Sequence, residues 1–437
     1  MASARGQLLS MLKVGLVGFG GGSALIPLVQ DELVSRRKVL DPPTFTRQTI
    51  VASITPGALP VKLGALAGLH TGGAPLALAM ALAVALPGTL LTIGLLASVS
   101  SGGEAAVRYV ELASVGITVF IIALLVHYIS RVLLDAAPSR STASVVAVVA
   151  WLATGIPQTV QLLGRMVGRE WDSLVPRLSA VQLVLAALGV IAGRALVRRE
   201  AGLAPTHPAG SDERTGSHVH RAAALLLSPA VIAAVMAGVL LGRPALELLG
   251  LVALSSLTSF GGGEAYVGVA DGFFVAGGHV DASVFYNQLV PVANALPGPI
   301  LVKLAAGIGY ASGSASGGPA MGWLLGGAAA LVAIGSCTAL AVLVMGAYSR
   351  AERSPVVRDI GAYMLPVICG LLVTTSVSML LEASQVAARS GQDPAPVVWV
   401  SLAAVAGVTA LRHFRALPDL VLLVACGAVS TAALAWL

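Results

Sequence analysis

Two lysines lie inside apolar stretches of this sequence, and each follows a Pro-Gly pair at the same spacing. Lys62 comes five residues after the glycine of Pro56-Gly57, and Lys303 comes five residues after the glycine of Pro297-Gly298. A lysine in a membrane-spanning helix costs about 2.5–3.5 kcal/mol on insertion scales, and such residues usually serve function. The repeated spacing therefore marks a candidate site.

We expect a half-helix to begin after each Pro-Gly pair, because proline cannot donate an N–H and interrupts a helix. Pro60 and Pro299 fit the first turn of these half-helices, where proline is favoured. A helix N-terminus offers free N–H groups and about half a positive charge, and Lys62 and Lys303 fall in its first two turns. An anion would neutralise both, so the pattern predicts a central pocket for a dianion. The alternative is that each lysine reaches the membrane interface or pairs with an acid.

Two glycine runs provide a second pair of helix breaks. They are Gly20, Gly21 and Gly22 in one stretch and Gly261, Gly262 and Gly263 in the other. Glycine costs about 1 kcal/mol relative to alanine inside a helix, and broken backbone at membrane depth is tolerated where it lines a cavity or is buried. The runs are predicted to line the site, with close helix packing as the alternative.

Three polar residues beside the breaks complete the candidate site. Ser53 and Asn294 stand at equivalent positions before the Pro-Gly pairs and could donate hydrogen bonds to an oxyanion. Glu264 follows the second glycine run, and is predicted either to couple transport to protons or to act as a counter-ion for a lysine. Enzyme motifs and metal-ligand spacings are not found in the sequence. We therefore expect neither catalysis, nor a cofactor, nor a bound metal.

The composition points to a membrane protein. Of 437 residues 57% are apolar and 11% are charged, and the mean hydropathy is +0.90. Apolar runs of transmembrane length recur along most of the chain, and they lack the alternation of barrel strands. The predicted fold class is thus an all-α polytopic membrane protein in a lipid bilayer. The net charge of +6 comes from basic residues between apolar runs, as in membrane topology signals, so nucleic acid binding is not expected.

The chain divides into two similar halves. Residues 19–70 align with 260–311 without a gap, and 16 of the 52 aligned positions are identical. We predict a first transporter repeat over 1–197, a polar linker with a connecting transmembrane helix over 198–243, and a second repeat over 244–437. The apolar runs predict helical segments near 8–30, 46–70, 75–100, 108–134, 142–163, 178–197, 222–243, 245–270, 284–311, 318–348, 358–382, 395–411 and 418–436.

Parity predicts that the repeats are inverted. Each half has six segments, and the segment 222–243 adds one crossing between them, which turns the second copy upside down. Inverted repeats with broken helices are a recurring design of secondary transporters. Basic residues favour a cytoplasmic location for the linker 198–221. Whether the segments 8–30 and 46–70 cross fully or form re-entrant hairpins stays open, although loop charges favour hairpins.

The motifs resemble those of the chromate ion transporter family. The matching stretches are FGGGSALIPLVQDELVSRRKVL (19–40), TPGALPVKLGALAGLHTGG (55–73), SFGGGEAYVGV (259–269) and NALPGPILVKLAAGIGY (294–310). The resemblance implies a bacterial inner-membrane protein that exports chromate, with sulfate as a related substrate. Ala58 stands where the family usually has a second proline, and both repeats resemble the single-unit members, which work in pairs. The oligomeric state is left open, with a homodimer as one alternative.

The leading hypothesis is a secondary transporter that moves a tetrahedral oxyanion, chromate or sulfate, by alternating access. Transport of another inorganic or organic anion is one alternative, and a membrane-embedded enzyme or scaffold is another. The sequence leaves the anion, the direction and the energy coupling undecided.

Overall fold

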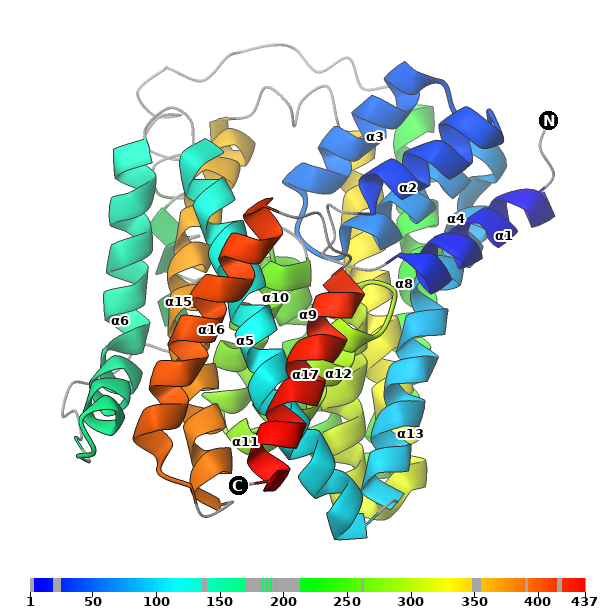
Figure 1. Cartoon of the computed structure of the whole chain (residues 1–437). Coiled ribbons are helices and arrows are strands. Elements are labelled where there is room, and N and C mark those ends of the chain that lie inside the picture. Colours follow the sequence, from blue (N-terminus) through cyan, green and yellow to red (C-terminus); the bar gives the residue numbers. More distant parts are fainter. Residues whose placement is uncertain are drawn as a thin grey trace.

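The protein is a bundle of helices. A computed structural model describes residues 4–18, 25–101, 103–135, 140–169, 213–260, 263–347, 355–389, 392–414 and 419–436, with scattered positions between 171 and 193. Of these described residues 91% are helical and none lies in a strand. The predicted all-α membrane fold is confirmed (Figure 1).

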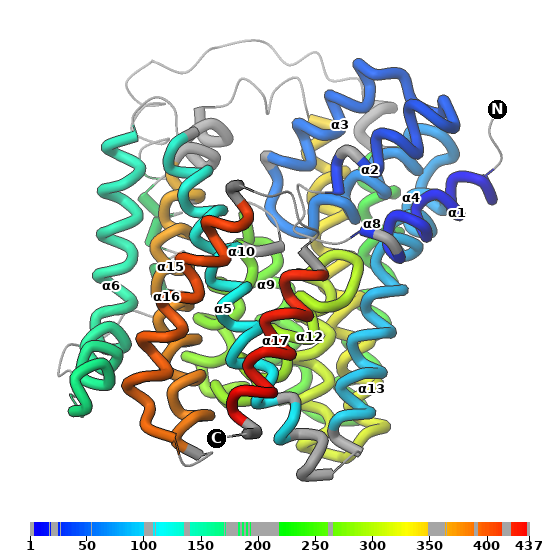
Figure 2. The backbone as a smooth tube through the Cα atoms, in the orientation of Figure 1, coloured from blue at the N-terminus to red at the C-terminus, as the bar shows by residue number. Residues whose placement is uncertain are grey.

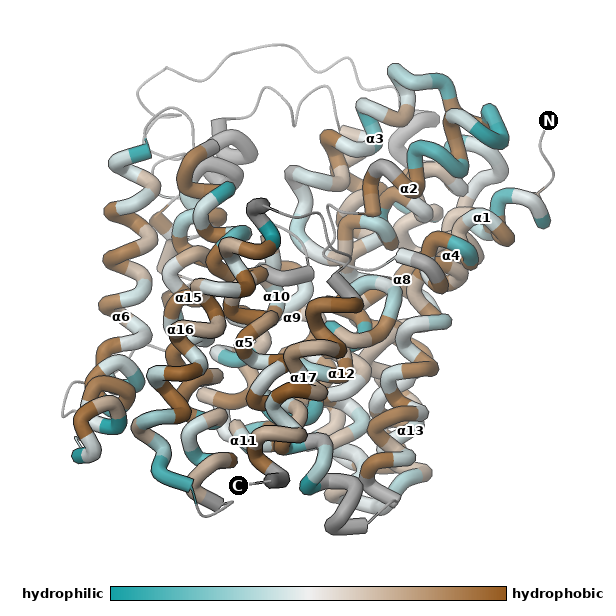
Figure 3. Tube along the Cα trace, viewed as in Figure 1, coloured by the Kyte–Doolittle hydropathy of each residue, from teal (hydrophilic) through white to brown (hydrophobic). Residues whose placement is uncertain are grey.

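Seven helices in the described part of the chain are long and apolar enough to cross a membrane. They are α4 (Leu59–Ser101), α5 (Gly103–Asp135), α6 (Arg140–Met166), α8 (Glu213–Leu241), α13 (Ile300–Gly346), α15 (Pro355–Arg389) and α16 (Pro394–Phe414). Large apolar side chains are exposed on these helices, for example Val145 and Val149 on α6 and Val235 and Val239 on α8. Apolar residues also recur along α5 and α16 (Figure 3). A surface of this kind is suited to lipid rather than to water.

The two longest helices fold back on themselves as hairpins. A straight helix of the 43 residues of α4 would be about 65 Å long, twice the roughly 30 Å of bilayer hydrocarbon. The backbone instead turns at Gly73 (φ +81°) in α4 and at Gly318 (φ +78°) in α13. The two arms of each hairpin touch at small residues: a Cβ on Gly68 would lie 2.7 Å from the Cα of Ala77. Small residues allow this close approach of helices in membranes.

Helices of the second half pack directly against helices of the first. The short helix α17 (Asp419–Trp436) runs alongside α5, and α15 runs alongside α6 (Figure 2). Glycines make these contacts close, because Gly116 on α5 faces the Cys426 carbonyl and Gly370 on α15 faces the Ala147 carbonyl. The halves therefore interleave instead of forming two separate bundles. The predicted repeat boundaries stay a prediction.

Short helices precede both hairpins in the same order. In the first half they are α1 (Ala4–Val17), α2 (Ile26–Gln30), the π-helix η1 (Asp31–Arg36) and α3 (Pro42–Ile54). In the second half they are α9 (Arg243–Thr258), α10 (Gly263–Ala270), the π-helix η2 (Asp271–Val275), α11 (Ala282–Val284), the π-helix η3 (Phe285–Leu289) and α12 (Val290–Ala295). Figure 1 places α2 and α3 towards one end of the bundle and α11 towards the other. The inversion of the repeats stays a prediction.

As expected from the glycine runs, the segments predicted over 8–30 and 245–270 are each divided between two helices, α1 and α2 in the first and α9 and α10 in the second. The 14 residues of α1 and the 13 residues of α3 give helices of about 20 Å, too short to cross the hydrocarbon by themselves. Their lengths suit the re-entrant alternative. The connecting helix α8 begins at Glu213, earlier than predicted, so the end of the linker 198–221 is helical. The rest of that linker, and most of the predicted segment 178–197, lie outside the described residues.

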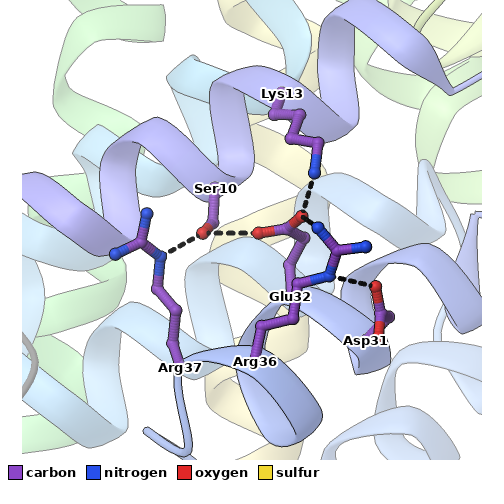
Figure 4. Close-up of polar contacts among 6 residues, drawn as sticks. All are labelled: Ser10, Lys13, Asp31, Glu32, Arg36 and Arg37. Carbon is purple, nitrogen blue, oxygen red and sulfur yellow. Dashed lines mark hydrogen bonds and ion pairs between the residues drawn. The ribbon is translucent and has the colours of Figure 1, made fainter.

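A cluster of charged side chains holds α1 against η1 (Figure 4). Glu32 is buried, and its carboxylate accepts hydrogen bonds from Lys13 at 2.5 Å and from Ser10 at 3.0 Å. Arg37 donates to the Ser10 hydroxyl at 2.5 Å, and Arg36 lies 3.6 Å from Glu32 and pairs with Asp31 at 2.7 Å. The cluster lies outside the seven candidate spans. It fixes η1 and the loop after it to α1, across the first glycine run in the sequence.

The hydrogen bond from Lys13 lowers the pKa of Glu32 below its ordinary value of 4.5, although burial opposes this shift. A group whose pKa is lowered by folding stabilises the fold above its ordinary pKa. This contribution is then lost as the pH falls below about 4.5.

We expect Glu32→Gln to reduce the stability of the protein by about 1–2 kcal/mol at neutral pH, because one charge-assisted hydrogen bond is replaced by a neutral one. The apparent melting temperature in detergent, measured from pH 7.5 to pH 3.5, should show a gap between variant and wild type that closes below pH ~4.5. Asp31→Asn is the matched control, since its pair with Arg36 is exposed and such pairs contribute little. A gap that persists at low pH would contradict the ionic role of Glu32.

Candidate functional site

The two Pro-Gly pairs lie in equivalent turns between helices. In the first, α3 ends at Ile54 and α4 begins at Leu59, and Gly57 has a φ of +103°. In the second, α12 ends at Ala295 and α13 begins at Ile300, and Gly298 has a φ of +95°. Residues with a side chain rarely adopt such φ values. Each turn therefore depends on its glycine.

Each of these turns is bonded to the other half of the chain. The N–H of Gly57 donates to the carbonyl of Ser259 at 2.7 Å, and the N–H of Gly298 donates to the carbonyl of Gly18 at 2.8 Å. Residues 18 and 259 differ by 241, as do 57 and 298. The two hydrogen bonds therefore join equivalent positions, one from the first half to the second and the other from the second half to the first. An exchange of this kind is characteristic of elements related by a two-fold axis.

The reciprocal bonds join the breaks in pairs, each across the two halves. Gly18 follows the end of α1, and Ser259 follows the end of α9. The turn before α4 therefore lies against the end of α9, and the turn before α13 lies against the end of α1. That these breaks form one binding site stays a prediction.

Each Pro-Gly turn packs closely against the other half of the chain. A Cβ on Gly57 would lie 2.2 Å from the Sγ of Cys337 on the second arm of α13. In the other direction, a Cβ on Gly88 in α4 would lie 2.2 Å from the carbonyl oxygen of Pro297. Each Pro-Gly turn is therefore wedged against the hairpin of the other half.

Both lysines are fully buried and bind backbone carbonyls. Lys62 and Lys303 are each 1% exposed. The ammonium of Lys62 donates to the carbonyls of Ala52 at 2.6 Å, Thr55 at 2.5 Å and Pro56 at 3.2 Å, and that of Lys303 donates to the carbonyl of Leu296. Thr55 and Leu296 are equivalent positions at the ends of α3 and α12, so both lysines cap a helix C-terminus.

The caps change how an anion would interact with the lysines. A helix C-terminus carries a partial negative charge, and each ammonium neutralises one that ends beside the candidate site. An ammonium has three N–H donors, and Lys62 directs them at three carbonyl oxygens. Direct binding of an anion by Lys62 thus requires it to release a carbonyl, whereas its positive charge acts without any movement.

The other residues of the predicted site are placed less centrally. Ser53 is exposed and its hydroxyl donates to Thr49 at 2.8 Å, and the Asn294 amide donates to Val290 at 2.9 Å, so both bond to their own helices. Pro60 is in the first turn of α4, as predicted, while Pro299 is the N-cap of α13. Gly263 begins α10. Gly20, Gly21, Gly22, Gly261 and Gly262 lie outside the described residues, as does the side chain of Glu264.

Four residues of this centre were not singled out from the sequence. Gly18 and Ser259 share the offset of the repeat but differ in type, so identity alone did not mark them. Gly88 and Cys337 take equivalent places against the opposite turns, yet their numbers differ by 249 instead of 241. The hairpin of α13 is longer than that of α4, so the gapless alignment ends before these residues.

A helical membrane protein whose helices are broken at one shared centre has the architecture of an ion transporter. Comparison with known proteins agrees: the chain belongs to the chromate transporter family, whose profile matches residues 7–169 and 246–431. The resemblance expected from the motifs is confirmed.

Three curated relatives are named as uncharacterized transporters. YwrB of Bacillus subtilis is 34% identical over 96 residues, which are 22% of this chain and 49% of the relative. YwrA of the same organism is 37% identical over 81 residues, 18% and 46% of the two chains. MJ0718 of Methanocaldococcus jannaschii is 35% identical over 91 residues, 21% and 22% of the two chains. The matches thus span half or less of these relatives, and no solved structure matches the chain.

Alanine at Gly57 should destabilise the protein by more than about 2 kcal/mol, because it combines backbone strain with overpacking against Cys337. Alanine at Gly298 should cost about 1–3 kcal/mol, mainly through backbone strain. The measurement is the melting temperature and the monodisperse fraction in detergent. Gly250→Ala in α9 is the control: its Cβ would meet no atom within 4 Å, so it should be neutral or stabilising. Normal stability of both turn variants would show that the turns tolerate side chains.

Proposed function

We propose that this chain is a secondary transporter of a tetrahedral oxyanion such as chromate or sulfate, working by alternating access. The observation that carries the proposal is the pair of reciprocal bonds between Gly57 and Ser259 and between Gly298 and Gly18. Each bond ties the turn that precedes a helix N-terminus and a buried lysine to the opposite half, which supports a site shared by the two halves. Membership of the chromate transporter family supports the choice of anion.

The anion would bind at the starts of α4 and α13. Free N–H groups and the positive ends of the helix dipoles favour an anion there without any further group. Lys62 and Lys303 add two positive charges and neutralise the C-termini of α3 and α12, which would otherwise repel the anion. Two buried positive charges match the charge of chromate or sulfate.

Alternating access would come from movement of the two halves about this centre. The hairpins on either side are tied to opposite halves by the reciprocal bonds, and inverted repeats of this kind rock around a fixed site. We further propose that the protein acts in a bacterial inner membrane, with the linker 198–221 on the cytoplasmic side and chromate export as its direction. Ion transport across a membrane follows from the family alone.

Flux of radiolabelled chromate and sulfate into proteoliposomes tests the proposal. We expect Lys62→Ala and Lys303→Ala each to lower the flux by about tenfold or more, the cost of losing one buried charge-assisted interaction. Lys38→Gln is the control, because Lys38 is exposed in the loop after η1. Equal flux by both variants and the wild type would overturn the site, and no flux of either anion by the wild type would overturn the substrate class.

Competition tests the charge and shape of the substrate. Sulfate and chromate are tetrahedral dianions of similar size, so unlabelled sulfate should inhibit chromate flux, whereas nitrate at the same concentration should not. A planar monoanion offers neither the second charge nor the geometry that two facing helix N-termini would bind. Inhibition by nitrate as strong as by sulfate would contradict a dianion site.

A further inference from the structure

A second polar region lies around the π-helix η2 of the second half, and the residues of the Pro-Gly turns do not line it. It is a cavity of about 360 Å³ between η2, α6, α15 and the loop that follows η2. All the charged side chains among its described lining residues are acidic: Asp271, Asp281 and Glu382. Its neutral polar lining includes Thr154, Gln158, Gln161, Tyr286, Ser378 and Gln385. A volume of this size holds roughly ten water molecules at about 30 Å³ each.

Asp271 is held in this cavity by hydroxyl groups from two other elements. The Tyr286 hydroxyl of η3 donates to its Oδ1 at 2.5 Å, and the Thr375 hydroxyl of α15 lies 3.4 Å from its Oδ2. Tyr286 is 1% exposed. Asp271 also begins a π-helix, a distortion that occurs frequently at functional sites. The carboxyl group is therefore fixed in position at the wall of the cavity.

The equivalent region of the first half, around the π-helix η1, is built differently. Its π-helix carries Glu32, which Lys13 and Ser10 bind directly. At the repeat offset, Leu254 and Leu251 stand in place of Lys13 and Ser10, and Tyr286 stands in place of Phe45. The second half thus lacks those basic and hydroxyl partners and gains a tyrosine that contacts Asp271. Both regions contain a π-helix with a carboxylate, but Glu32 is bound by a lysine and a serine, whereas Asp271 is bound by a tyrosine and a threonine.

The charge of the cavity excludes the proposed substrate. Carboxylates repel a dianion, and their repulsion is stronger away from bulk water. Carboxyl groups are instead the usual carriers of protons in pumps and transporters. We propose that Asp271 takes up and releases the proton that couples to anion movement, an inference that rests on the proposed function.

The proton step is a simple exchange with water. The Asp271 carboxylate accepts a proton from a hydronium ion in the cavity, which leaves water, and the carboxylic acid later returns the proton to water on the other side. Tyr286 keeps its own proton throughout and orients the carboxyl group. The titratable groups that face Asp271 are Tyr286 from η3, Glu382 from α15 and Asp281 from the loop, while α6 presents the neutral Thr154, Gln158 and Gln161. None of the described lining residues belongs to α5, α9 or α13.

This assignment differs from the one that the sequence suggests. Glu264, the carboxyl group predicted for coupling, lies seven residues earlier, on α10. Its side chain is outside the described residues, whereas Asp271 has both a defined hydrogen-bond network and a cavity.

Proteoliposomes with wild type, Asp271→Asn and Tyr286→Phe separate coupling from transport. Two readouts are needed: exchange of labelled sulfate at equal pH on both sides, and sulfate accumulation driven by a pH gradient, followed together with an internal pH dye. We expect Asp271→Asn to keep exchange within about threefold but to lose gradient-driven accumulation and proton movement by about tenfold, about 1.4 kcal/mol. Glu247→Gln, an exposed partner of Arg243, is the control and should behave as wild type.

Tyr286→Phe guards against a folding defect in the first variant. It keeps the carboxyl group and removes one hydroxyl, so accumulation should persist with a shifted pH of half-maximal rate. The coupling proposal is overturned if Asp271→Asn still accumulates sulfate, if Tyr286→Phe leaves the pH profile unchanged, or if wild-type exchange runs without any response to the pH gradient. Absence of wild-type exchange would overturn the proposed function instead.

Discussion

A backbone group inside a membrane must find its hydrogen-bond partner within the protein, because lipid offers none. This constraint governs the centre of the molecule, where four helices are broken. The turn at Gly57 leaves an N–H that an unbroken helix would satisfy, and the turn at Gly298 leaves another. Each is satisfied by a carbonyl at the end of a helix in the opposite half, Ser259 or Gly18. One half could not keep its break without the other.

The buried lysines solve the complementary problem. A broken helix also leaves carbonyls at its C-terminus, and Lys62 donates to three of them while Lys303 donates to the equivalent carbonyl in the second half. Structural and electrostatic roles therefore coincide in the same side chain. The lysine that completes the end of α3 also supplies positive charge beside the start of α4, where an anion is favoured.

Duplication gives the two halves one backbone plan, and substitution then separates their chemistry. The π-helices η1 and η2 occupy corresponding places, yet Glu32 is bound by a lysine while Asp271 is bound by hydroxyls and faces a cavity. A symmetric pair of breaks suits a substrate that both halves contact. The first half has Gln30 at the position equivalent to Asp271. An acid at this position in only one half suits a function that needs a single charge to be gained and lost, as coupling to a proton does.

The sequence by itself determined the membrane class, the helical fold, the family and the paired breaks, because hydropathy, Pro-Gly pairs and a constant offset are local patterns that survive in a single chain. Even so, it left open whether the segments 8–30 and 46–70 cross the membrane or turn back, since apolar runs do not show where the backbone goes after a break. Only the tertiary structure decided what the breaks bind. The partner of Gly57 lies 202 positions away at Ser259, and no local pattern encodes which carbonyl will satisfy a freed N–H. The direction of the lysines was decided in the same way, because only the folded chain shows that each ammonium turns back to the carbonyls at the end of the preceding helix.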